Sequence, residues 1–418
     1  MTPPSNGRAL LVVEDEFLTR HVGVRRVIGH YWDRLNRSGY QVDIAAPQDS
    51  VLTLAADTDV RRARDTVLAS HPGSSAPVWT SRDDDFPEHG DLESPASSIP
   101  PIAWTGDTAR VSDYEVSVLT NPWMCAEDVP PDSYTHGIVY DLVPNLVSAG
   151  ALDLGEFVDV TAFAHEHHLG FRFFEQYAAT VTCISECTRR DLLRFYLRGE
   201  PGRAVVDVPF DSRQNGRAVR SRSRSTTLAD TGDQSAHVLL VNPLDHRKNL
   251  VGIQETLLTL AEDRSLKVSV VGRERMPWQA AVGFFTDLTD AGVTVEWFRG
   301  ASDARLDALY DEADALLFPS LYEGLGLPIL EAQAHGLPVV SSSTSSCGEI
   351  NLNGTLTAEP TDVDGITDSM RACLDGEAGI MRDEELRAAL DEFIQGHGRG
   401  LHWGLPDDDA EPAPARAG

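Results

Sequence analysis

Lysine is almost absent from this chain: of its 35 basic residues only two are lysines, Lys248 and Lys267. A codon bias against lysine explains this scarcity by itself, so rarity alone makes neither lysine functional. Acidic residues number 65, and the formal net charge is −30. Because such a surface repels polyanions, the charge excludes a broad footprint for nucleic acid or an anionic membrane. An anionic ligand would therefore need a local basic pocket.

Cysteine pairs and long apolar runs are also missing. The five cysteines are odd in number and include no CxxC pair, which argues against a disulfide framework or a zinc cage. No run of about 18 apolar residues occurs, and the short apolar stretch after Arg8 does not make a signal peptide. We expect a cytoplasmic chain with no transmembrane segment; peripheral contact with a membrane and the oligomeric state stay open.

Short apolar runs rich in β-branched residues recur along the chain, and helix-like segments separate most of them. Buried parallel strands have this composition, and their alternation with helices predicts an α/β fold with two doubly wound sheets. The runs lie at 9–13, 42–46, 114–119, 137–143, 179–185, 237–242, 266–272, 293–298, 315–320 and 337–343.

Polar segments divide the chain into parts. Residues 211–236 are rich in Ser and Arg without apolar periodicity, which predicts an exposed linker or loop. It would join an N-terminal domain, 1–210, to a C-terminal domain, 237–405. A polar stretch at about 72–100 reads as an insertion in the first domain, and the acidic, Pro/Ala-rich end, 406–418, as a disordered tail.

The most informative stretch is "FPSLYEGLGLPILEAQAHGLPVV", residues 318–340. It reads as a strand, a loop with glycines, a helix and a second strand. Free amides at such a helix start suit an anionic or hydroxyl-rich ligand. The missing third glycine argues against a dinucleotide fingerprint. Glu323 and Glu331 flank the loop and can face one crevice, although a loop acid and a first-turn helix acid would look the same.

This stretch resembles the signature of family 4, glycogen-synthase-like retaining glycosyltransferases, in which two acids are spaced E-x7-E. "VEWFRGASDARLDALYDEADALLFPS", "HVLLVNPLDHRKNL" and "VTCISECTRRDLLRFY" resemble further blocks of the family. The resemblance covers about residues 135–345 and is weaker elsewhere. It implies a GT-B fold, in which two Rossmann-like domains face each other across a cleft and the C-terminal one binds a nucleotide-sugar.

The resemblance also implies an activity: retaining transfer of a hexose from a nucleoside-diphosphate sugar to a glycan or lipid-linked acceptor in polysaccharide or glycoconjugate biosynthesis. No cofactor and no metal are implied. By the family pattern, Glu331 binds ribose hydroxyls, Glu323 binds donor-sugar hydroxyls, and Arg247 and Lys248 grip the diphosphate. The amides that would serve the sugar and phosphates belong to Gly324, Leu325, Gly326 and Leu327.

A physical reason supports cations at this position. When a nucleoside diphosphate departs, negative charge builds on its phosphate oxygens. A compact ammonium and a forked guanidinium, as in Lys248 and Arg247, are suited to neutralise that charge.

Some positions depart from the family pattern. Asn242 and Pro243 stand where many relatives have a glycine followed by Arg or Thr, so one phosphate contact is in question. Gly23 lies where relatives place a glycine loop near the phosphates, although a plain helix-start glycine fits equally well.

The acceptor side is less clear. In "YDLVP", Tyr140 replaces a histidine that often precedes the family's aspartate, here Asp141. The cluster "HEHH" lacks the spacing of a zinc HExxH motif, so His167 and His168 are candidates for the acceptor side or for the surface, not for a metal site.

Other functions stay in view. A same-fold nucleotide-sugar epimerase or hydrolase would share the donor site, and a catalytically silent nucleotide-sugar-binding module fits the departure at Asn242. A pyridoxal-dependent phosphorylase is disfavoured, because it needs a Schiff-base lysine. Lys248 is assigned to the diphosphate, and Lys267 lies in a predicted strand.

Overall fold

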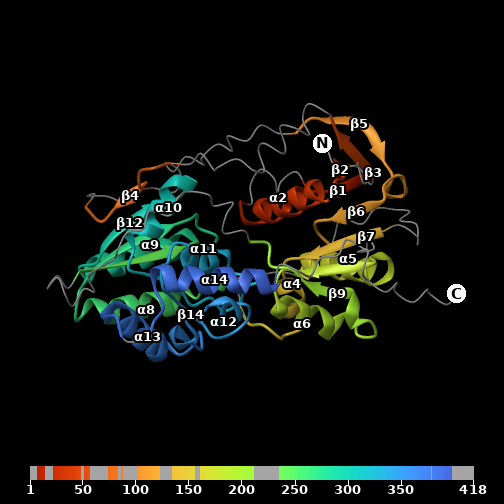
Figure 1. Ribbon diagram of the computed structural model, residues 1–418. Helices are drawn as coiled ribbons and strands as arrows, with labels where there is room; N and C mark the ends of the chain where they lie inside the picture. The colour runs from red at the N-terminus through yellow and green to blue at the C-terminus, as the bar shows by residue number, and fades with distance from the viewer. Residues whose placement is uncertain are drawn as a thin grey trace.

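The computed structural model describes residues 7–14, 22–48, 51–56, 74–82, 86–87, 102–122, 134–155, 161–210, 235–377 and 379–397. Two α/β domains, each built on a largely parallel sheet, face each other (Figure 1). This arrangement confirms the predicted fold class.

The first domain contains a sheet with the strand order β5-β3-β2-β1-β6-β7-β8-β9. Pairs from β2 to β9 are parallel, whereas β3 and β5 extend one edge in antiparallel fashion. The strands are β1 (Arg8–Val12), β2 (Gln41–Gln48), β3 (Val51–Ala55), β5 (Trp104–Ala109), β6 (Val116–Leu119), β7 (Tyr134–Val139), β8 (Thr180–Cys183) and β9 (Ala204–Val206). The helices are α2 (Val22–Arg37), α4 (Val143–Ser148), α5 (Thr161–Tyr177) and α6 (Glu186–Phe195).

The second domain contains a sheet with the order β15-β14-β13-β10-β11-β12-β4. Its strands are β10 (Ser235–Val241), β11 (Ser265–Val271), β12 (Thr294–Phe298), β13 (Ala315–Phe318), β14 (Val339–Ser342), β15 (Thr357–Ala358) and β4 (Trp79–Thr80). Its helices are α8 (Leu250–Ala261), α9 (Trp278–Asp290), α10 (Asp303–Glu312), α11 (Leu327–Ala334), α12 (Cys347–Ile350), α13 (Val363–Asp375) and α14 (Asp383–His397). All pairs except β12–β4 are parallel.

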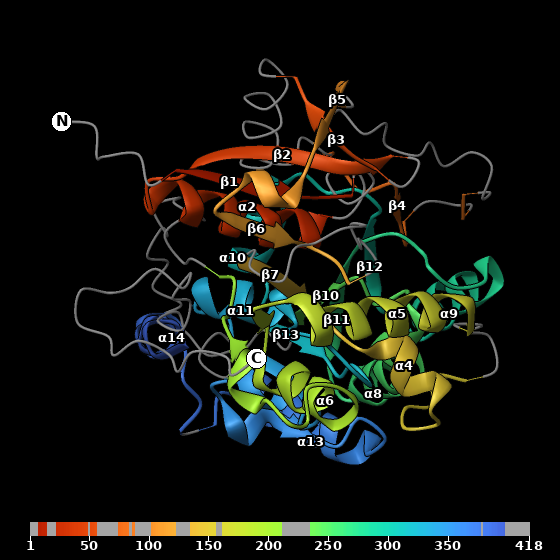
Figure 2. The ribbon, with the colours of Figure 1, turned by 90° about the vertical axis from the view of Figure 1, so that its right-hand side faces the viewer.

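Strand β4 departs from the predicted division of the chain. It lies in the polar stretch that the sequence assigns to the first domain, yet it pairs antiparallel with β12 of the second (Figure 2). Trp79 is buried there, with ring centroids 4.8 Å from Phe86 and 5.5 Å from Phe285. Trp79 and Phe86 are isolated aromatic residues in a polar stretch, so the sequence shows no apolar periodicity from which their partner could be predicted. Only tertiary packing assigns this segment to the second domain.

The predicted boundaries fall partly outside the described residues. Residues 211–234 of the proposed linker and the proposed tail, 406–418, belong to that undescribed part. Ser235 and Ala236, which were placed in the linker, already belong to β10. Of the cysteines, the four that the structure describes are buried and unbridged. No helix among the described residues has the length and apolar character needed to cross a membrane.

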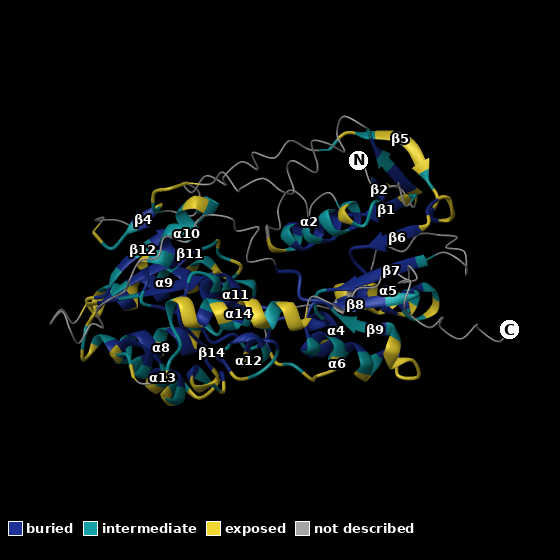
Figure 3. Ribbon diagram, in the orientation of Figure 1, coloured by how far each residue is buried: buried dark blue, intermediate teal, exposed yellow. Residues whose placement is uncertain are grey.

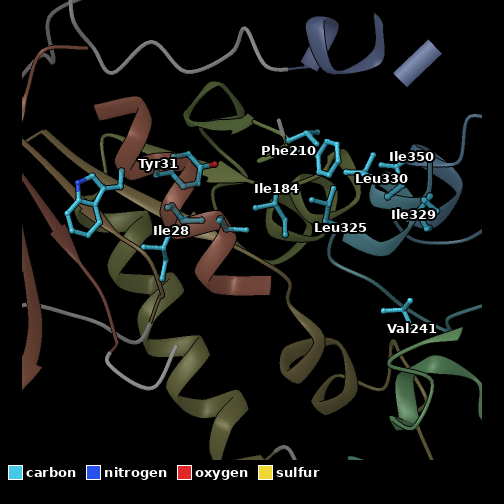
Figure 4. Packing of buried hydrophobic residues seen from close by; sticks show 14 of the residues in the cluster. Ile28, Tyr31, Ile184, Phe210, Val241, Leu325, Ile329, Leu330 and Ile350 are labelled. Atoms are coloured by element: carbon cyan, nitrogen blue, oxygen red, sulfur yellow. The ribbon is translucent and has the colours of Figure 1, made fainter. Parts of the chain in front are cut away.

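Buried apolar side chains fill both faces of each sheet, and one cluster is shared by the two domains. It extends from Ile28 and Tyr31 in α2, through Ile184, to Leu325 and Ile329 of the second domain (Figure 4). The strands of both sheets are mostly buried, whereas the outer helix faces and β5 are more exposed (Figure 3). The domains therefore meet through an apolar contact, to which Leu325 of the predicted site contributes.

Candidate active site

Lys248 lies in a tight turn at the carboxyl end of β10. The Asp245 carboxylate accepts a hydrogen bond from the Arg247 backbone N–H at 3.0 Å and so fixes a single 3₁₀ turn, His246–Lys248. Asn249 follows with φ of 59°, in the left-handed region that asparagine tolerates, and its side chain caps α8. The "DHRKN" sequence thus forms the turn through its own capping side chains.

Glu323 lies in the loop between β13 and α11. Strands β10 and β13 are parallel neighbours, so their carboxyl ends bring this loop beside the Lys248 turn. The Leu321 backbone N–H donates to the Arg247 carbonyl oxygen at 2.7 Å, which ties loop and turn together. Gly326, with φ of 88°, occupies the left-handed position that begins α11.

Lys248 and Glu323 form a buried ion pair. The Lys248 ammonium donates to Glu323 Oε1 at 2.5 Å, and each side chain is about 10% exposed. The ammonium also lies 4.3 Å from the centre of the Phe318 ring. Low solvent access strengthens both interactions. The sequence analysis assigned Lys248 to the diphosphate of the donor and Glu323 to its sugar. The structure shows that the two side chains contact each other.

Arg247 joins this pair to the first domain. Its guanidinium lies 3.4 Å from Asp245 Oδ1 and 3.9 Å from Asp141 Oδ2, and Asp141 belongs to the first domain. Burial alone would lower the pKa of Arg247, but the carboxylates of Glu323, Asp245 and Asp141 raise it above its usual value. Arg247 therefore stays charged at the contact between the domains.

Glu331 has partners that the sequence did not reveal. The Tyr310 hydroxyl donates to Glu331 Oε2 at 2.8 Å, and Arg26 of the first domain donates to Oε1. Arg26 also lies 3.2 Å from Asp303. The Glu331 carboxylate raises the pKa of Arg26. Arg26 was visible only as part of "RHVGVRRVIGHY", because partners about 300 residues apart leave no local spacing signal.

The glycine at position 23 does lie opposite the predicted loop. A Cβ built on Gly23 would be 3.7 Å from Leu327 Cδ1, which is an ordinary contact distance. Gly324 has less room, because a Cβ there would lie 2.0 Å from the Tyr140 carbonyl oxygen. Its missing side chain thus admits the first domain's backbone, a use that the sequence interpretation, focused on a ligand, did not foresee.

The two candidate histidines of "HEHH", His167 and His168, have different surroundings. His167 is buried in α5 with its ring 4.3 Å from that of Phe163, and burial lowers its pKa to about 4, partly offset by Asp141. His168 is exposed and its Nδ1 lies 2.9 Å from the Tyr196 hydroxyl. The Asp141 carboxylate therefore acts on the buried His167.

Asn242 stands where relatives have glycine, and its backbone conformation explains why asparagine can replace glycine there. Its φ is 52°, again in the left-handed region, and its N–H donates to the Val271 carbonyl oxygen at 2.6 Å. Asparagine is one of the few residues with a side chain that adopts this conformation readily.

Known proteins resemble the two domains to different extents. Residues 230–395 match the family model described as "Glycosyl transferases group 1". These residues form a group 1 glycosyltransferase domain. The site described above, apart from the residues that the first domain contributes, lies within it.

Curated relatives match this chain over part of their length. O-antigen chain mannosyltransferase B of Escherichia coli is 32% identical over 134 residues, which are 31% of this chain and 35% of that protein. The match thus spans about a third of the relative's length.

Solved structures match nearly the whole chain. A glycosyltransferase from Rickettsia africae matches with a TM-score of 0.57 and 12% identity, covering 94% of both chains. Anabaena HepE, solved in complex with UDP and glucose, matches with a TM-score of 0.56 and 13% identity, covering 94% of this chain and 98% of HepE. At such identities the likeness establishes the GT-B fold.

Proposed function

We propose that this protein is a retaining glycosyltransferase that moves a hexose from a nucleoside-diphosphate sugar to a glycan or lipid-linked acceptor, without a metal ion. Glycan biosynthesis is the role that this activity and the group 1 domain favour.

The observation that carries the proposal is the meeting of Lys248, Arg247 and Glu323 at the carboxyl edge of β10 and β13. Placing two poorly exposed cations side by side costs desolvation energy, and such an arrangement is typical of a functional site. It stands out in a chain with a net charge of −30. An ammonium has three N–H donors. Lys248 can therefore hold Glu323 and still donate to a phosphate oxygen of the departing diphosphate.

The carboxylates have complementary roles in this proposal. Glu323, held by Lys248, accepts hydrogen bonds from donor-sugar hydroxyls, and Glu331, held by Tyr310, accepts them from the ribose. The amides of residues 324 to 327 at the start of α11 face the sugar and phosphates. On the opposite side, Asp141 and His167 belong to the acceptor half of the cleft.

Protein cations replace a metal in this scheme. Arg247 remains protonated at every working pH, because three carboxylates raise its pKa. Within the described ranges, no three His, Cys, Asp or Glu side chains gather in a group that could hold a metal ion. The proposal therefore assigns the neutralisation of the diphosphate to Lys248 and Arg247.

The test begins with donor binding. A panel of nucleoside-diphosphate sugars is screened for thermal stabilisation, since a ligand bound only by the folded state raises its stability by mass action. The stabilising donor is then incubated with glycan and lipid-linked acceptors, and the anomeric configuration of the product is determined by NMR. We expect an acceptor-dependent product that keeps the donor's configuration.

Three other results would contradict the proposal. Inversion of configuration would exclude the retaining mechanism. Conversion of the donor without any acceptor would indicate an epimerase or hydrolase. Stabilisation by a donor with no turnover for any acceptor would indicate a silent binding module.

A further inference from the structure

The loop that carries Glu323 is held by the first domain. The carbonyl oxygen of Gly324 accepts hydrogen bonds from the Ser185 hydroxyl at 2.6 Å and the Thr188 hydroxyl at 3.1 Å. Ser185 is the N-cap of α6 and Thr188 lies in its first turn, and both are completely buried. The close approach requires glycine, because a Cβ at position 324 would collide with the Tyr140 carbonyl oxygen.

A second contact, in the opposite direction, joins the same two elements. Glu349, in α12 of the second domain, accepts hydrogen bonds from the backbone N–H groups of Glu186 at 2.8 Å and Cys187 at 3.0 Å. Its carboxylate therefore caps α6, where a negative charge also complements the helix dipole. Each domain thus satisfies free polar groups of the other.

Hydrogen bonds also hold the backbone of Glu323 and of the residues that follow it. Its own N–H donates to Ser345 Oγ at 3.1 Å. The Ser346 hydroxyl lies 2.9 Å from the carbonyl oxygens of Glu323 and Leu325, to either of which it donates. The remaining carbonyl in this stretch, that of Gly324, is the one bound by the first domain. The Glu323 backbone is therefore held by residues of its own domain, whereas the adjacent Gly324 carbonyl is held by the first domain.

From this geometry we infer that Ser185, Thr188 and Glu349 form an interdomain clamp that positions Glu323 against Lys248 for the transfer reaction. The inference rests on the proposed function and extends it to regulation of the same site. When the clamp is closed, the Glu323 carboxylate points at the ammonium. When the domains separate, the Gly324 carbonyl loses its hydrogen bonds from Ser185 and Thr188, and the loop is held less firmly.

Two pairs of variants test the clamp. Thr188→Val removes one hydroxyl with little change of shape, and Thr188→Ser restores it. The matched control is Thr367→Val: Thr367 is also buried in a helix, but its hydroxyl donates to Val363 within α13. Glu349→Ala removes the cap of α6, with Asp362→Ala as control, because Asp362 caps α13 by accepting from the Gly365 N–H at 3.0 Å.

Two readouts are measured for each variant. Hydrogen exchange of the peptide 319–330 reports on the loop itself. We expect faster exchange in Thr188→Val and Glu349→Ala, but not in Thr188→Ser or the controls. Steady-state kinetics report on positioning. We expect kcat to fall about ten- to a hundredfold in both clamp variants with donor KM within about threefold of wild type, because small misplacement of a reacting group is costly.

The outcomes separate the clamp from the proposed function. Unchanged exchange in both clamp variants would show that the contacts do not hold the loop. Faster exchange with unchanged kcat, or an equal loss in Thr188→Ser, would show that the loop is held but that Glu323 is not positioned by it. Failure of the wild-type protein to transfer any sugar would overturn the proposed function and the positioning role, while the exchange data would still decide whether the clamp exists.

Discussion

Glu323 and Glu331 belong to one loop-helix unit, yet their cations come from different domains. Glu323 is paired with Lys248, a neighbour on the same sheet edge. Glu331 is paired with Arg26, which comes from helix α2 of the first domain. The first pair is built by one domain, whereas the second exists only when two domains meet.

The two ion pairs also differ in solvent exposure. The Lys248 side chain is 10% exposed and that of Arg26 is 32% exposed. Water and salt screen the Arg26 pair more strongly, so it exchanges partners at a lower energetic cost. The comparison indicates that one domain supplies both partners of the Glu323 pair, which the interdomain clamp then positions, whereas a donor must displace Arg26 from Glu331.

The largest expected effect is that of Lys248→Met, which keeps the aliphatic stem and removes the charge. Losing one charge-assisted contact to the leaving diphosphate should cost about 2–4 kcal/mol of transition-state stabilisation, or about thirty- to a thousandfold in kcat/KM. Single-turnover assays measure it. Lys248→Arg should recover only part of the loss, since a planar fork does not reproduce a compact ammonium.

The other lysine supplies the control for that experiment. Lys267, in β11, forms an ion pair with Glu296 at 3.0 Å and is 34% exposed. Lys267→Met should leave catalysis nearly unchanged. If the two lysine variants behaved alike in these assays, codon bias would suffice to explain the two lysines and the assignment of Lys248 would be wrong.

Glu323→Gln should lower kcat about ten- to a hundredfold with normal folding. The amide keeps the shape but loses the charge that holds Lys248 and the sugar hydroxyls, whose contacts strengthen in the transition state. Steady-state kinetics with circular dichroism as a folding check measure this. Wild-type kcat in the variant would remove Glu323 from the site.

Glu331→Ala should act mainly on donor binding. Loss of hydrogen bonds to a charged acceptor costs about 1.5–3 kcal/mol, so donor Kd should rise about tenfold or more while kcat changes less. Calorimetric titration with the stabilising donor measures Kd. A fall confined to kcat would contradict the assignment of Glu331 to the ribose.

Arg26→Met should have a smaller effect of the opposite sign. Removing a partly exposed partner worth about 0.5–1 kcal/mol frees Glu331 Oε1, so donor Kd should fall about two- to fivefold. The matched control is Arg37→Met on the same helix, since Arg37 pairs locally with Asp33 at 2.6 Å. Weaker donor binding in Arg26→Met would mean that Arg26 is itself a donor ligand.

EDTA should have no effect on transfer, because Lys248 and Arg247 are proposed to neutralise the diphosphate. Initial rates are compared before and after chelation. Activity that is lost with EDTA and restored by Mg²⁺ or Mn²⁺ would show the metal-independent assignment to be wrong.

The sequence predicted local features well wherever one element carried the whole signal. The apolar runs at 237–242 and 266–272 became β10 and β11. The structure brings Lys248 and Glu323 together, because the turn and the loop that carry them follow the neighbouring parallel strands β10 and β13. The sequence analysis missed two antiparallel edge strands. The residues of β5, WTGDTA, are too polar to give a buried-strand pattern, whereas β3, VLTLA, is a short apolar run that was not included among the predicted strands.

By itself the sequence determined the α/β class, the order of strands and helices in the second domain, and the turn and loop that present Lys248 and Glu323. These follow from apolar periodicity and from capping residues a few positions apart, which act locally. Only the tertiary structure decided that Arg26 meets Glu331, that Ser185 and Thr188 hold the Gly324 carbonyl, and that β4 joins the other domain's sheet. Those contacts join residues more than a hundred positions apart, and their energies arise from burial that exists only after both domains have folded and met.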